Sequence, residues 1–248
     1  MKRRSLLAIG LAIYALGVIA FAPATLVDAG LQRVSDGKLQ IVDVEGTLWS
    51  GSGQLELLDA AGRSGVAKHL AWRLRPESLL RGHLTGDVQL GQDGKAFPVT
   101  VSGSKIEIAN ADISLPAAAL GLGLPRLAAL GLTGDMVLHI PGLAIGHGQA
   151  WGKLGLRLRE AGSVFTPIFP LGDYEFELDA NGPAIQVLLH TLKGPLQLDG
   201  KGSWATGSSP DFLVIAQVAS EHLEQLGPLL RLIAVERGPG RFELQFRQ

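Results

Sequence analysis

Short runs of alternating apolar and polar residues, separated by turn-forming residues, are the feature of this sequence that most restricts its fold. The clearest run closes the chain, where Phe242, Leu244 and Phe246 alternate with polar and charged residues directly after a Gly-Pro-Gly turn at 238–240. A period of two is typical of strands that bury one face. Comparable runs recur at 70–74, 84–90, 97–101, 136–140, 154–158, 174–178 and 185–189. The sequence therefore predicts a mainly β protein with a largely antiparallel sheet.

A few short helices are expected between these strands. Pro76 and Gly82 frame one turn in the order that suits a helix, with proline near its start and glycine at its end. The stretch 114–130 is rich in Ala, Leu and Gly and predicts one or two helical turns. Apolar residues at helical spacing over 223–233 predict a further helix, which Pro228 makes short or bent.

The N-terminus has the pattern of a membrane anchor. Lys2, Arg3 and Arg4 precede an uncharged stretch over 5–27, whose most apolar part is 6–21. A helix of about 20 residues crosses a bilayer, and cations before the span keep its N-terminus in the cytoplasm. We expect residues 1–27 to form a cytoplasmic tail and single transmembrane helix, and residues 28–248 a periplasmic β-rich domain, with Pro141 as an option for a midline within it.

A cleaved signal peptide is the alternative interpretation of this segment. Ala22, Pro23 and Ala24 match a small-residue cleavage site. The anchor is favoured because Pro23 sits inside that site, and because the apolar run is longer than the roughly 7 to 15 residues usual in a signal peptide.

Composition and motifs exclude several classes of function. The chain carries 22 basic and 23 acidic residues and no cysteine, so neither a nucleic-acid footprint nor a thiolate or disulfide site is expected. The six histidines lack the spacing of a metal site, and no nucleophile-elbow, phosphate-loop or dinucleotide signature is complete. Glu175 and Glu177 share a strand face and are expected to be solvated rather than catalytic. The sequence predicts no enzyme, no cofactor and no metal.

Glycine and tryptophan form the most distinctive local pattern. Residues 46–53 read Gly-Thr-Leu-Trp-Ser-Gly-Ser-Gly and follow the predicted anchor closely, and Trp72-x-Leu74-x-Pro76 comes next. A strand over 196–204 ends in Gly-x-Trp, and a Leu-Leu pair at 229–230 precedes the last hairpin. The residues singled out as a structural or partner-contact motif are Gly46, Leu48, Trp49, Gly51, Gly53, Trp72, Pro76 and Trp204.

These segments resemble protein N of the bacterial type II secretion system over essentially the whole chain. The resemblance implies an accessory, non-enzymatic inner-membrane protein that contacts other type II secretion components in the periplasm, in the inner-membrane platform or at the secretin. It also implies a likeness to AsmA-like envelope proteins, whose curved sheets form an open half-barrel. The alternative function is therefore to hold or guide lipid along an apolar β-trough.

Trp49 has two interpretations within this resemblance. A large ring in a glycine-rich stretch either fills the first layer of the core or docks onto a partner near the membrane. The core position is favoured, because Gly46, Gly51 and Gly53 are suited to turns and close packing that would hold the ring inward.

Overall fold

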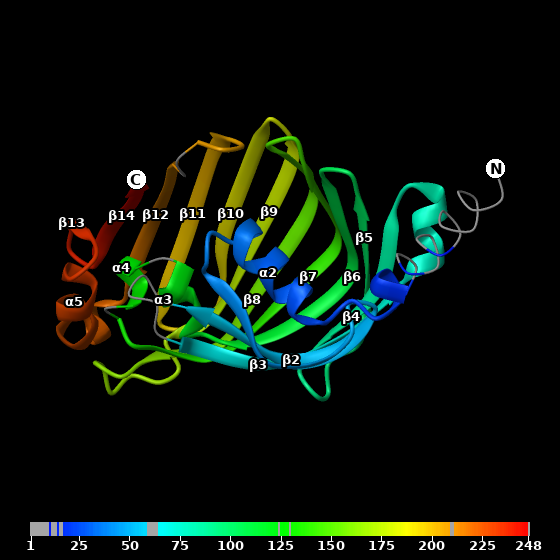
Figure 1. Ribbon diagram of the computed structural model, residues 1–248. Coiled ribbons are helices and arrows are strands. Elements are labelled where there is room, and N and C mark those ends of the chain that lie inside the picture. Colours follow the sequence, from blue (N-terminus) through cyan, green and yellow to red (C-terminus); the bar gives the residue numbers. More distant parts are fainter. Residues whose placement is uncertain are drawn as a thin grey trace. The chain divides into compact units, whose positions relative to one another are not determined.

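The computed structural model describes residues 10, 14, 17–58, 64–123, 125–128, 130–208 and 211–247, and these residues form two compact units that divide between Asp93 and Gly94. Both units consist mainly of antiparallel strands, as the alternation predicts (Figure 1). The division differs from the midline considered near Pro141, which lies inside a strand of the second unit.

The first unit is a meander with one helix packed against its first strand. Its elements are α2 (Thr25–Val34), β1 (Leu39–Gly46), β2 (Ser50–Leu58), β3 (Ser64–Arg75), the 3-10 helix η1 (Pro76–Arg81) and β4 (Leu84–Leu90). The strands pair in chain order, β1-β2-β3-β4, and each pair is antiparallel. The predicted turn at Pro76 is confirmed, since η1 ends on Gly82 in the left-handed conformation at φ 78°.

The second unit is an open sheet of hairpins with short helices. Its first elements are β5 (Phe97–Ser102), β6 (Lys105–Pro116), α3 (Ala119–Gly123), α4 (Pro125–Ala128), β7 (Leu132–Gly146), β8 (Gln149–Ser163), β9 (Gly172–Gly182) and β10 (Ala184–Lys193). The others are β11 (Leu196–Ala205), β12 (Asp211–Val218), η2 (Ser220–His222), α5 (Leu223–Arg231), β13 (Val235–Gly238) and β14 (Arg241–Arg247).

Strand order in the second unit follows the chain up to β12, after which β14 pairs with β12 and leaves β13 at the edge. The helices predicted over 114–130 and 223–233 are confirmed as α3, α4 and α5, and Pro228 lies inside α5. Figure 1 shows β7 to β12 side by side, with α3, α4 and α5 at one end of these strands.

Local backbone chemistry explains two features of β7 and the turn that follows it. His147 and Gly148 both have positive φ, 53° and 69°, between the paired residues Gly146 and Gln149. They form a two-residue hairpin turn whose twist suits antiparallel strands. The positive φ that this turn needs accounts for the glycine at position 148. Pro141 lies at a register shift in β7, and a proline without an N–H is tolerated in a strand at such a bulge. Pro141 therefore marks a bulge rather than a domain boundary.

Candidate functional site

The glycine and tryptophan motif of the first unit forms a junction with the segment that precedes α2. We call residues 46–53, which include the end of β1, the connection 47–49 and the start of β2, the Trp49 turn. The Leu48 N–H donates to the carbonyl of Ala22 at 2.8 Å, and the Trp49 indole N–H donates to the carbonyl of Ile19 at 2.8 Å. Pro23 and Thr47 form an isolated antiparallel bridge. The Trp49 turn therefore holds the segment 19–23, which precedes α2, against the sheet of this unit.

Trp72 is the tryptophan that fills the core of the first unit. Its ring is only 5% exposed and packs with Ala24, Ile41 and Leu70, and its indole N–H donates to the carbonyl of Leu48 at 3.1 Å. Val27 and Leu31 of α2 pack against this cluster. One ring thus connects the helix, the sheet and the Trp49 turn.

The glycines of the motif leave room for these side chains. A Cβ on Gly51 would lie 2.6 Å from the Trp72 ring, and a Cβ on Gly53 would lie 2.6 Å from Cγ2 of Ile41. Gly46 has a φ of 95°, a backbone conformation that residues other than glycine rarely adopt. Each glycine is therefore required by a close approach or by its backbone conformation.

Trp49 does not belong to the buried core, contrary to the position that the sequence favoured. Its ring is half-buried, because it lies over the turn and reaches back to Ile19, while Trp72 occupies the space under α2. Pro76 starts η1 in the same unit. Trp204 lies in the second unit, so the motif predicted from the sequence is divided between two units.

The predicted membrane span falls largely outside the described residues. Of residues 6–21, the structure describes 10, 14 and 17–21. Among the residues that are described, no helix has both the length and the apolar character needed to cross a membrane.

The second unit carries an apolar sheet face that sequence reasoning did not assemble. Residues paired directly across antiparallel strands share a face. One such row starts at Leu138 of β7 and crosses the sheet to β14; its members, in order, are Leu138, Leu156, Phe176, Leu189, Gly200, Val214 and Leu244. We call the side of the sheet that carries this row the apolar face.

Further rows extend the apolar face on both sides. Met136, Leu158 and Tyr174 are paired across β7, β8 and β9, and Leu154, Leu178, Val187 and Gly202 are paired across β8 to β11. Ile185 pairs with Trp204, which places this tryptophan on the same face. Leu156 and Phe176 are half-buried, whereas Leu189 and Val214 are buried. In the described part of the second unit no further sheet packs on this face.

The opposite side of the same strands carries charged residues among apolar ones such as Val137 and Ile215. The row next to that of Leu156 contains Arg157, Glu175, His190 and Asp199. The Arg157 guanidinium lies 2.6 Å from Glu175, and His190 lies 3.2 Å from the same carboxylate. The hydrogen bond from Arg157 lowers the pKa of Glu175. Glu175 is therefore held in ion pairs.

A second carboxylate stabilises the end of β9. Asp173 accepts the backbone N–H of Glu160 at 2.8 Å, and this bond, together with Lys193 at 3.3 Å, lowers its pKa. Within the described ranges, no three acidic or histidine side chains gather closely enough to hold a metal ion. The charged side of the sheet carries ion pairs such as Arg157 with Glu175 and Lys193 with Asp173.

A change of phase in the apolar positions of β6 and β7, with a bulge in β7, is what the sequence pattern did not reveal. In β6 the apolar positions shift phase at Asn110, and in β7 they shift at Pro141, so that Ile108 pairs with Leu143 on the apolar face. Asn110 has a positive φ of 49°. A bulge inserts one residue and restores the alternation on the original face. An asparagine opposite a proline, each between apolar runs, is the sequence pattern from which this change of phase could have been predicted.

These features define a class of antiparallel β protein in which one sheet face is apolar and the other carries charged residues. The family model for the type II secretion system, protein N, matches residues 37–245. The chain belongs to this family. No curated protein sequence and no solved structure matched it. Family membership gives the chain an accessory role in type II secretion, which is a machine of the cell envelope.

Proposed function

We propose that this chain is a non-catalytic component of type II secretion that binds another component of the machine in the periplasm through the apolar face of its second unit. The continuity of that face is the observation that carries the proposal. From Leu138 to Leu244 the row crosses seven neighbouring strands without a charged residue. At about 4.8 Å between strands, the row is roughly 29 Å wide.

Its size suits a protein partner. A helix is about 10 Å in diameter with its side chains, so the face is wide enough for a helix to lie across several strands. Contiguous apolar surface rimmed by polar residues is typical of interaction sites. The half-buried Leu156 and Phe176, on β8 and β9, are available for such a contact.

The Trp49 turn ties the N-terminal segment to the first unit. In this proposal the N-terminal segment is the single membrane anchor, and the hydrogen bonds from Leu48 and Trp49 hold its end against the sheet of the first unit. Exposed Phe21, at 82%, and Val18, at 55%, lie on this N-terminal segment. Aromatic and apolar residues of this kind suit the interface between membrane and water.

Lipid binding is the second candidate function, and the same face favours it. A trough without charges could accommodate an acyl chain as AsmA-like envelope proteins do. Family membership favours the protein partner over the lipid.

Photo-crosslinking from two adjacent residues would test the proposal. A benzoylphenylalanine at position 156 replaces Leu156 on the apolar face, and the matched control replaces Arg157 on the opposite face of the same strand. In cells with an active secretion machine, we expect a cross-link to another type II secretion protein from position 156 and none from position 157. Cross-links to lipid from position 156 would support the second candidate instead. Equal yields from both positions, or none from 156 while secretion continues, would refute the assignment of the face.

A further inference from the structure

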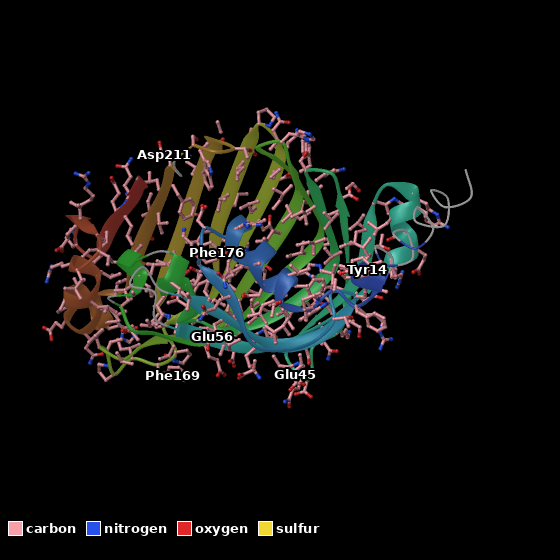
Figure 2. The ribbon with its side chains drawn as sticks, in the orientation of Figure 1. Tyr14, Glu45, Glu56, Phe169, Phe176 and Asp211 are labelled. Carbon is pink, nitrogen blue, oxygen red and sulfur yellow. The ribbon has the colours of Figure 1, made fainter. Side chains whose placement is uncertain are left out.

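An uncharged loop with exposed apolar side chains connects β8 to β9. We call residues 163–171 the Phe165 loop. Val164, Phe165 and Phe169 are 69%, 63% and 62% exposed, although all three are large and apolar. From 161 to 172 the chain contains no ionisable side chain. Figure 2 labels Phe169 at the lower edge of the view, beyond the ends of the strands.

The loop rests on a second segment that is free of acidic residues. The Ser163 hydroxyl donates to the carbonyl of Leu130 at 2.6 Å, and the Val164 N–H donates to the carbonyl of Gly131 at 3.1 Å. The sequence from 113 to 134 contains no carboxylate, and its single charge is Arg126. Two neighbouring segments at this end of the unit therefore present no negative charge to an approaching surface.

Several backbone donors of the loop are hydrogen-bonded within the unit. The Phe165 N–H donates to the Ser163 hydroxyl at 3.1 Å, the Ile168 N–H to the Thr166 hydroxyl at 3.3 Å, and the Leu171 N–H to the carbonyl of Ala161 at 2.7 Å. Pro167 and Pro170 have no N–H to satisfy. In water these hydrogen bonds add little stability to an exposed loop, because water can accept from the same N–H groups. In a lipid environment, by contrast, each unpaired donor would be costly.

We propose that the Phe165 loop inserts its apolar side chains into the interfacial region of a lipid bilayer. Aromatic and aliphatic side chains gain free energy by leaving water for this region, and neither of the two segments, 113–134 and 161–172, contains a carboxylate that would oppose approach to anionic headgroups. The internal hydrogen bonds lower the free-energy cost of moving the loop backbone, together with its side chains, from water into the interfacial region. This contact is independent of what binds the apolar face, since it lies in a loop rather than on the sheet.

Site-specific fluorescence can test the insertion, because the chain contains no cysteine. The variant Phe165→Cys, labelled with an environment-sensitive fluorophore, is compared with Ser104→Cys, an exposed position in the turn between β5 and β6. The labelled full chain is reconstituted into vesicles of phosphatidylethanolamine with a minority of phosphatidylglycerol. Lipids carrying a doxyl group on the acyl chain then report contact with the bilayer.

Insertion predicts a blue-shifted emission for the label at position 165, with loss of fluorescence on doxyl lipid and protection from aqueous iodide. The label at position 104 should respond to iodide and not to doxyl lipid. Val164→Cys, in the same loop, should behave as Phe165→Cys does. If the label at 165 is as accessible to iodide as the one at 104, the proposal is wrong. It is also wrong if that label is shielded only after other secretion proteins are added, because the loop is then a protein contact.

Discussion

Trp72 should contribute more to the stability of the first unit than Trp49, although Trp49 is the more conspicuous residue in the sequence. Trp72→Ala removes a ring that is 5% exposed and opens a cavity beneath α2. Truncation of a buried tryptophan costs about 3 to 5 kcal/mol. The carbonyl of Leu48 also loses its indole donor at 3.1 Å, which adds about 1 kcal/mol.

Trp49→Ala removes less buried surface than Trp72→Ala and should cost less stability. Its ring is half-buried, and its main polar contact is the single hydrogen bond to Ile19 at 2.8 Å. Loss of one hydrogen bond and part of the packing predicts a cost of about 1 to 2 kcal/mol. Trp72→Phe is the matched control, since it keeps a buried aromatic ring while it removes the indole N–H together with the smaller ring of the indole. We expect it to cost about 1 to 2 kcal/mol as well.

Native-state hydrogen exchange on the full chain in detergent micelles measures these differences unit by unit. A loss of about 4 kcal/mol should accelerate exchange of the β2 and β3 amides roughly a thousandfold in Trp72→Ala. The amides of β9 and β10, in the other compact unit, should exchange at the parent rate. Equal effects of Trp49→Ala and Trp72→Ala in β2 and β3 would refute the assignment of Trp72 to the core.

Two further predictions concern the close packing of the first unit and the acid sensitivity of the second. Gly51→Ala should lower the free energy of unfolding by about 1 to 3 kcal/mol, because its Cβ would overlap the Trp72 ring. Urea denaturation followed by circular dichroism would detect this loss, with Gly238→Ala as the comparison, because a Cβ on Gly238 would meet no atom within 4 Å. Asp173 has a pKa below its ordinary value of 3.8, mainly because it accepts the Glu160 N–H. Its charged form therefore stabilises the fold above pH 3.8, and this contribution is lost as the pH falls through the lowered pKa. Asp173→Asn should flatten that part of the acid unfolding curve, and an unchanged curve would contradict the role assigned to Asp173.

The sequence by itself determined the strand content, the antiparallel pairing and the short helices. Alternation of apolar and polar residues is a local property, and most strands pair with the next strand along the chain, so nearby turn residues are sufficient to set each hairpin. Pro76 and Gly82 likewise placed η1 through their own backbone preferences. The family resemblance, carried by the glycine and tryptophan segments, was confirmed by the match over residues 37–245.

Only the tertiary structure decided which tryptophan is buried and how far the apolar face extends. A glycine-rich stretch around Trp49 does not specify what packs above it; α2 covers Trp72 instead, and Trp49 turns toward Ile19. The longest row of the apolar face depends on the register of seven residues from seven strands, and the bulge at Pro141 preserves the face although it breaks the local pattern. Burial and register are set by long-range contacts, which a period of two residues cannot encode.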